Sequence, residues 1–245
     1  MPESGADATG TSKVNEGSSM PAYRLGDNEF AVRKYDIVGQ DSATLGFFVR
    51  HVGLSDEDRP SLRVSDELSL VHMGPPLRRG DSGLAVHIIG TVNLTSDDLR
   101  QVSVFIDEVG LEYEAEKVRT VRQYIVHPHV RSPDLNCPFR RFSCAGFVIE
   151  AYRDAGIELI AIESNQLPAV SLETLAEAYP DQRERLQDSR MRQRVGLEGD
   201  GPWPVILAGY TFNSLARSAV DIRQYPYVPV PGDEFFPPIR SSTTR

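Results

Sequence analysis

Hydrophobic positions in the first half of the chain come in short runs that favour strands. Residues 29–38 and 43–52 are rich in Phe, Val and Ile and are bounded by Gly and Asp. Further apolar or β-branched runs follow at 68–73, 84–94, 102–109, 111–115 and 118–126. Runs of this length and composition are typical of strands, and the short links between them favour antiparallel pairing. The pattern therefore predicts a mainly antiparallel sheet.

The spacing of hydrophobic residues becomes helical after residue 143. One apolar stripe runs through Cys144, Phe147, Val148, Ala151, Tyr152 and Ala155. Positions three and four residues apart lie on one face of an α-helix. Ser143 can cap the start of this helix, and Gly156 can supply the left-handed residue at its end. Two more helices are predicted at 171–186, capped by Ser171, and within 203–216.

The two ends of the chain differ from its middle. Residues 1–22 are small, polar and aperiodic, which predicts a disordered segment because so little apolar surface can be buried. Residues 225–245 carry five prolines and predict an extended tail whose aromatic residues pack against the body. We expect one α+β domain over 23–224, with a helix packed on an antiparallel sheet.

Composition narrows the possible partners. The 245 residues carry a formal net charge of −9, with Lys and Arg spread along the chain, whereas nucleic-acid binding needs a concentrated basic surface. No apolar run reaches the length of a membrane span, and residues 1–20 lack the apolar segment of a secretory signal. We therefore expect a soluble, cytoplasmic protein that does not bind nucleic acid and does not span a membrane.

The two cysteines, Cys137 and Cys144, are expected to be thiols in a reducing compartment. A zinc site would need both of them together with distant histidines such as His127 and His129, whose His-Pro-His spacing is weak evidence. We expect no metal and no cofactor.

Cys144 is the strongest candidate for a chemical role. A thiol attacks carbonyls as a thiolate, and a helix N-terminus or a neighbouring imidazolium lowers the pKa of a cysteine. All five histidines precede Cys144, and His87 lies inside a β-rich run that would aim its ring rigidly. His127 is a reserve candidate. Glu112 or Glu114, on one face of a predicted strand, could orient the imidazole as a third residue.

The residues around Cys144 resemble a known family. Residues 142–148 (FSCAGFV), continuing to 152–157 (YRDAGI), are similar to the nucleophile helix of the NlpC-type papain-like hydrolases. The turn Arg79-Gly80-Asp81 before the His87 run resembles the Gly-Asp turn of that family. The order of histidine before cysteine resembles its circularly permuted branch, which includes YiiX-like proteins and lecithin:retinol acyltransferase relatives. Ser143 and Ala145 stand where the family has an acidic residue and a serine.

The resemblance implies a papain-like fold and a catalytic set of Cys144, His87 and Glu114. It implies attack of Cys144 on the carbonyl of an amide or ester, a thioester intermediate, and its resolution by water or another acceptor. The backbone N–H of Cys144 would help to hold the oxyanion. Substrates in the range of the family are peptides, isopeptides, cell-wall peptides and lipid acyl groups. The altered residues beside Cys144 favour an alternative, a non-catalytic binding or scaffold module of the same fold.

Overall fold

The computed structural model describes residues 22–25, 29–42, 45–64, 66–74, 76–115, 125, 139–163 and 166–237. Within them, a six-stranded antiparallel sheet forms one layer of an α+β fold, with strand order β1-β8-β3-β4-β6-β7. Its strands are β1 (Ala22–Arg24), β3 (Ile37–Ser42), β4 (Phe48–Ser55), β6 (Leu70–Met73), β7 (Leu77–Asp81) and β8 (Ile88–Gly90). Two small antiparallel pairs join β2 (Phe30–Val32) to β5 (Arg59–Leu62) and β9 (Ala169–Val170) to β10 (Trp203–Pro204).

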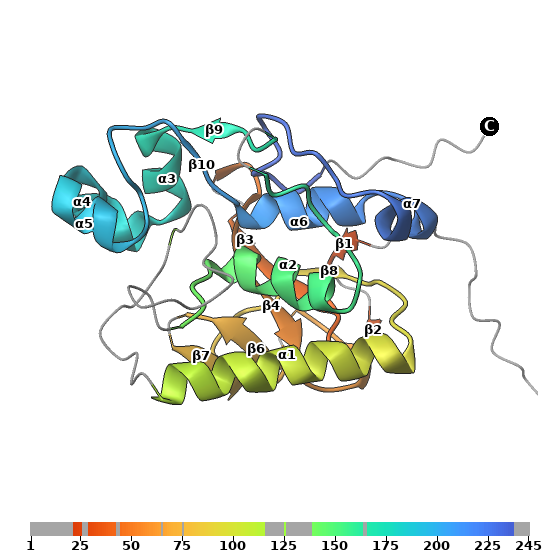
Figure 1. Ribbon diagram of the computed structural model, residues 1–245. Helices are drawn as coiled ribbons and strands as arrows, with labels where there is room; N and C mark the ends of the chain where they lie inside the picture. Colours follow the sequence, from red (N-terminus) through yellow and green to blue (C-terminus); the bar gives the residue numbers. More distant parts are fainter. Residues whose placement is uncertain are drawn as a thin grey trace, which may run out of the picture.

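Helices cover this sheet. They are α1 (Ser96–Ala115), α2 (Cys144–Asp154), α3 (Leu172–Ala178), α4 (Arg183–Gln187), α5 (Ser189–Arg194), α6 (Ala208–Leu215) and α7 (Ala219–Gln224), with a 3-10 turn at Pro180–Gln182. Figure 1 shows α1, α2 and α6 running across the sheet, while α3, α4 and α5 gather at one end. The amino-terminal end of α2 points toward that group.

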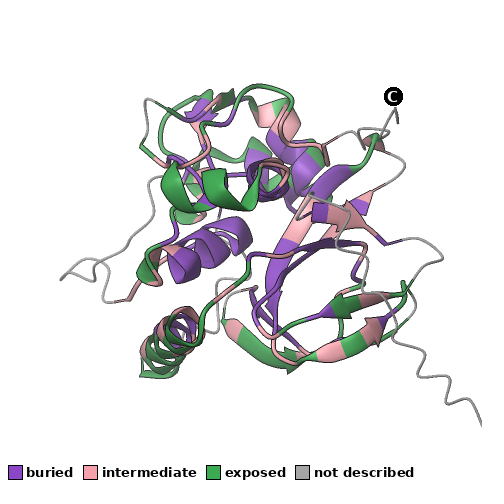
Figure 2. Ribbon diagram, turned by 90° about the vertical axis from the view of Figure 1, so that its right-hand side faces the viewer, coloured by how far each residue is buried: buried purple, intermediate pink, exposed green. Residues whose placement is uncertain are grey.

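Helix α2 lies at the centre of the molecule. It contacts α1 on one side, α6 on the other, and β4 and β6 beneath it. Every residue from Cys144 to Tyr152 is buried, and the helix accordingly stands out in Figure 2 as an almost wholly buried element. A helix enclosed on all sides positions its first residue rigidly.

The local sequence explains where α2 begins and ends. The Ser143 hydroxyl accepts a hydrogen bond from the backbone N–H of Gly146 at 3.0 Å, which caps the first turn. Gly156, at φ +77°, takes the left-handed conformation just beyond the helix. The predicted helix is therefore confirmed together with both of its end signals.

The predicted strands at 102–109 and 111–115 are wrong, because these residues form the second half of α1. The Thr95 hydroxyl accepts a hydrogen bond from the Asp98 N–H at 3.2 Å, and the Asp98 carboxylate accepts one from the Thr95 N–H at 2.8 Å. This reciprocal cap starts the helix. Its buried stripe consists of Val102, Phe105, Ile106, Val109 and Tyr113. Contact with α2 outweighs the strand preference of these β-branched and aromatic residues, since tertiary packing commonly overrides propensity.

Other boundaries also differ from expectation. The predicted strand at 84–94 contributes only Ile88–Gly90, and the predicted helix at 171–186 is divided into α3, the 3-10 turn and α4 at Pro180. Helix α6 starts at Ala208, after β10. Of the predicted strand at 118–126, only Ile125 is described. Ala22 belongs to β1 and is buried, while the rest of the N-terminal segment lies outside the described residues.

The C-terminal segment is tied to the sheet over its described part. The backbone N–H of Val49 donates to the Glu234 carbonyl at 3.1 Å, and that of Phe236 donates to the Phe47 carbonyl at 3.0 Å. The Phe235 ring meets Phe48 edge to face, with centroids 5.5 Å apart. These contacts fix the end of β4 that precedes the candidate site.

Replacing Tyr152 by Phe should destabilise the protein by about 1–3 kcal/mol, the usual cost of leaving a buried polar group unpaired. The Tyr152 hydroxyl donates to the Tyr35 carbonyl at 2.8 Å inside the core, joining α2 to the turn before β3. Tyr225→Phe is the matched control, because Tyr225 is exposed. Denaturant unfolding checks this, and equal stability of the two variants would contradict it.

Candidate active site

Cys144 occupies the first position of α2, and its side chain is enclosed. The residue is 6% exposed. Burial raises the pKa of the Cys144 thiol, while the backbone N–H groups of Val52, Ala145 and Cys144 itself act in the opposite direction. The prediction that the helix N-terminus lowers the pKa of Cys144 is therefore wrong, because burial has the larger effect. Cys144 is a neutral thiol in the free protein at neutral pH.

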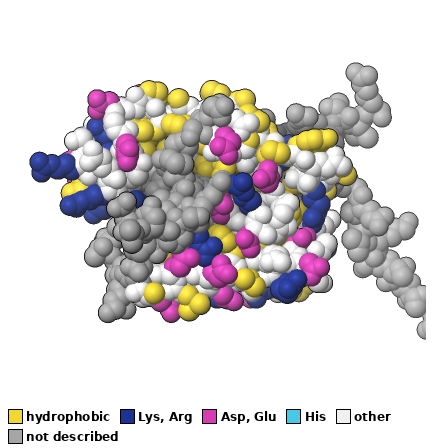
Figure 3. All heavy atoms as spheres, in the orientation of Figure 1, with side chains coloured by type: hydrophobic (Ala, Val, Ile, Leu, Met, Phe, Trp, Pro, Cys, Tyr) yellow, Lys and Arg dark blue, Asp and Glu magenta, His cyan; other side chains and the backbone are white. Residues whose placement is uncertain are grey.

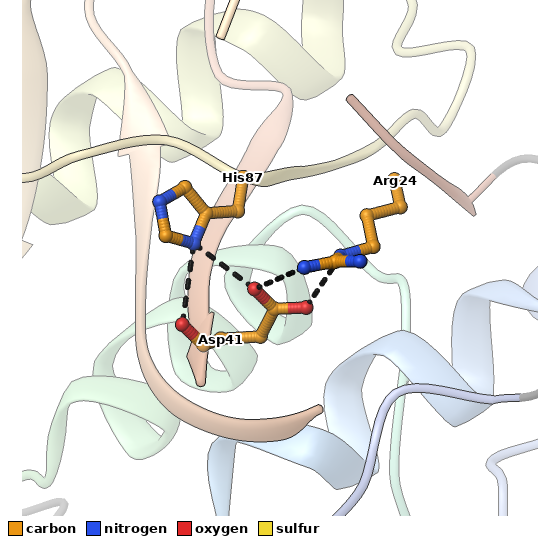
Figure 4. A network of polar contacts seen from close by, with 3 residues as sticks. All are labelled: Arg24, Asp41 and His87. Carbon is orange, nitrogen blue, oxygen red and sulfur yellow. Dashed lines mark hydrogen bonds and ion pairs between the residues drawn. The ribbon is translucent and has the colours of Figure 1, made fainter. Parts of the chain in front are cut away.

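His87 lies just before β8 and belongs to a network with Asp41 and Arg24 (Figure 4). Its Nδ1 lies 2.9 Å from the Asp41 carboxylate, and the Nε of Arg24 donates to the same carboxylate at 2.8 Å. The Asp41 side chain is fully buried, whereas the other two are 31% exposed. Because a carboxylate only accepts, Nδ1 of His87 carries the proton.

The structure does not bring the three predicted site residues together. Strand β3 separates β8 from β4, which places the His87 backbone about 10 Å from the strand that Cys144 contacts. In the described part of the chain, no hydrogen bond joins the Cys144 sulfur to a histidine ring. Glu114 is exposed on α1, and Asp41 is the carboxylate that orients His87. Glu112 instead binds Arg140, with its Oε1 2.8 Å from the guanidinium Nε.

A second histidine cluster lies on β4 and β6, next to the strand position that Cys144 contacts. His51 Nε2 is 2.9 Å from His72 Nδ1, and His72 Nε2 is 3.2 Å from Asp81 Oδ2. The residue after His51 is Val52, whose backbone N–H points to the Cys144 sulfur. His51 is thus one residue from the point where α2 meets the sheet.

The hydrogen bonds of this cluster determine where its protons lie. The Asp81 carboxylate can only accept, so His72 donates from Nε2, and a neutral His72 then accepts at Nδ1. His51 must therefore donate from Nε2, which leaves the lone pair on its Nδ1. A ring fixed in this tautomer has the free basic nitrogen that a general base needs.

The pKa shifts of the cluster support this assignment. Burial lowers the pKa of His51 to about 3, with the neighbouring His72 and Arg78 contributing in the same direction. Burial also lowers the pKa of His72, although Asp81 opposes this. The Gly83 N–H, Arg78 and His72 hold the pKa of Asp81 at about 2. At neutral pH both rings are therefore neutral and Asp81 is ionised.

A cavity of about 380 Å³ opens beside these histidines. His51, His72 and Asp81 line one part of it, and Tyr179, at the end of α3, lines another. Burial and then the charge that Cys144 would carry as a thiolate raise the pKa of Tyr179. Tyr179 thus lies near the sulfur as well as in the wall of the cavity, which makes this cavity the candidate active site.

Sequence reasoning did not single out His51 or His72. Both lie in apolar strand-like runs, at 43–52 and 68–73, which is the feature that favoured His87. Neighbouring antiparallel strands can present such residues side by side, so two histidines in consecutive runs were the available signal. Which strands become neighbours depends on the whole sheet.

Other predicted features lie partly outside the described residues. Cys137, His127 and His129 lie outside the described residues. The zinc hypothesis and the reserve role of His127 as a base therefore stay predictions. Within the described residues, no group of three or more His, Cys, Asp or Glu side chains could hold a metal ion. No described helix has the length and apolarity that a membrane span needs. Acidic and basic side chains are intermixed on the face in Figure 3.

Compared with protein-family models, curated proteins and solved structures, the chain gives no match in any of the three. The site therefore has to be interpreted from its own geometry.

Acid should destabilise the protein through His51. Its folded pKa of about 3 lies below the ordinary 6.5, so the unfolded state binds the proton more strongly. The stability is fully present above pH 6.5 and is lost as pH falls toward 3. Between pH 7 and pH 4 this loss should be about 3 kcal/mol, at roughly 1.4 kcal/mol per pH unit.

The change His51→Gln keeps a donor toward His72 but removes the titrating ring. Denaturant unfolding at pH 7 and pH 4 should show a smaller loss for this variant than for the parent. His87→Gln, at the partly exposed histidine of the other cluster, is the control. An unchanged loss in His51→Gln would show that His51 is not buried as a neutral ring.

Proposed function

We propose that the protein is a cysteine hydrolase or acyltransferase, with Cys144 as nucleophile and His51 as general base. One observation carries the proposal: Tyr179 lines the same cavity as His51, whose ring is oriented by His72 and Asp81, and also lies close enough to the Cys144 sulfur to feel its charge. A nucleophile, a base and a group that orients the base are the usual parts of such a site; here the base and its orienting groups line the cavity, and the cysteine lies behind its Tyr179 wall. The six-stranded antiparallel sheet with a buried cysteine helix is consistent with a papain-like fold of the permuted NlpC type.

His51 is favoured over His87 as the base because of strand order and cavity position. His51 lies on β4, which α2 contacts, and lines the cavity with Tyr179. His87 lies two strands away and is not among the residues that line this cavity. In this proposal His72 and Asp81 take the orienting role that the resemblance would give to Glu114.

The reaction begins from two neutral groups. As the sulfur attacks the carbonyl carbon of an amide or ester, the thiol proton passes to Nδ1 of His51. The C–S bond forms, and the carbonyl oxygen becomes an oxyanion that the helix-terminal N–H of Cys144 can stabilise. Collapse breaks the bond to the leaving amine or alcohol, which takes the proton from His51.

A thioester then joins the acyl group to Cys144. Water, or another acceptor, gives its proton to His51 and attacks the thioester carbonyl. The C–S bond breaks, the sulfur recovers the proton, and the acid or the transferred acyl product leaves. Each step conserves atoms and electrons without a cofactor, and Asp81 stabilises the charge that the histidine pair gains.

A binding or scaffold module is the second candidate function. The specific observation that favours it is the enclosure of Cys144, whose 6% exposure and raised pKa are those of an inert structural thiol. In that case the cavity would bind a ligand without covalent chemistry.

Alkylation of Cys144 by iodoacetamide separates these functions. If His51 removes the thiol proton during attack, the rate should be nearly independent of pH between about 4 and 8, because both groups keep their protonation states. In His51→Ala only the thiolate reacts, so the rate should rise about tenfold per pH unit below the thiol pKa. Mass spectrometry of the labelled peptide measures the rate at Cys144 separately from Cys137.

His87→Ala is the matched control and should keep the pH-independent rate. A tenfold rise per pH unit already present in the parent would remove His51 as the base. A Cys144 that stays unlabelled at every pH until the protein unfolds would favour the binding module.

A further inference from the structure

Arg50 is the least explained charged residue at the candidate site. It is only partly exposed, and its Nε is buried without a hydrogen-bond partner. Among the described residues no carboxylate forms an ion pair with its guanidinium. A cation removed from water without a partner is costly, so such a group needs a separate explanation.

A bulge in the sheet directs Arg50. Gln40 pairs with His51 and Asp41 pairs with Val49, which leaves Arg50 as the extra residue of β4. Bulges re-aim side chains and are frequent beside active sites. This one places Arg50 in the wall of the cavity, immediately before the proposed base.

Of the charged groups that line the cavity, only a positive one is left without a partner among the described residues. Arg50 and Arg78 both line it, and among the described lining residues Asp81 is the only acidic one. That carboxylate is already bonded to His72, Arg78 and the Gly83 N–H. The cavity therefore presents a guanidinium that no described residue pairs, in a protein whose net charge is −9.

We infer that Arg50 binds an anionic group of the substrate, so that the enzyme acts on acyl compounds carrying a carboxylate close to the scissile bond. The planar fork of a guanidinium matches the two oxygens of a carboxylate, and phosphate presents the same chemistry. Because Arg50 is adjacent to His51 in sequence, an anion bound there lies near the reacting carbonyl. This inference rests on the proposed function, since it assigns the substrate class of the same site.

Two alkylating reagents that differ only in charge test the inference. Iodoacetate carries a carboxylate, whereas iodoacetamide is its neutral amide. The ratio of their rates at Cys144 should favour iodoacetate in the parent protein. Arg50→Gln should lower that ratio about tenfold while the iodoacetamide rate changes less than twofold, because one charge-assisted contact is lost. Arg50→Lys, which keeps the charge but loses the fork, should lower it less.

Arg79→Gln is the matched control, because Arg79 is exposed on β7 and pairs with Asp107 on α1. It should leave the ratio unchanged. Melting temperatures of all variants show that they remain folded. Rapid labelling by iodoacetamide with no effect of Arg50→Gln on the ratio would overturn the anion site and leave the nucleophile in place.

A second measurement covers the case in which neither reagent labels folded Cys144, which would end the proposed nucleophile. NMR signals of the His51 and His72 rings are titrated with acetate, inorganic phosphate and neutral acetamide. Saturable shifts with acetate that weaken at least tenfold in Arg50→Gln support the anion site. Equal shifts with acetamide, no saturation, or a response to phosphate alone overturn the carboxylate assignment.

Discussion

The enclosure of α2 is the constraint on which the rest of the structure depends. Contacts with α1, α6 and the sheet bury every residue from Cys144 to Tyr152. Ser143 caps the start of the helix, and Tyr152 near its end bonds the turn before β3. The position of Cys144 against β4 is a consequence of this packing. So is the raised pKa of its thiol, because desolvation disfavours the thiolate.

Burial has a parallel effect on the histidine pair. His51 is held neutral, with a pKa of about 3, and His72 accepts its N–H because Asp81 occupies the other nitrogen of His72. The helix dipole favours a thiolate at its N-terminus, but full burial outweighs it here, since the direction of the Cys144 shift is upward. In the proposed mechanism the resting state is therefore a neutral thiol and a neutral histidine, and charge develops only during the reaction.

The sequence predicts the local features better than the long-range ones. The α2 stripe, Ser143 and Gly156 are signals within fifteen residues, and all three are confirmed. The α1 residues have the same helical spacing, but their β-branched composition favoured a strand; the cap at Thr95 and Asp98 and packing against α2 favour the helix. Cys144 could be selected as a candidate from its place on the helix. The pairing of His51 with His72 could not be predicted, because strand order brings the two rings together.

The two histidine–carboxylate pairs show why an oriented imidazole alone does not define a base. Asp41 is fully buried and shared between His87 and Arg24, so it joins β1, β3 and the approach to β8. That pair is compensated by its own arginine and has a structural explanation without any ligand. Asp81 is also paired with an arginine, Arg78. Its histidine, His72, in turn orients a second ring, that of His51, which lines a cavity. The second arrangement combines a lone pair on His51 with the wall of a cavity, and beside it lies Arg50, a cation without a partner among the described residues. The groups left uncompensated by the fold, rather than the well-paired ones, indicate where chemistry can occur.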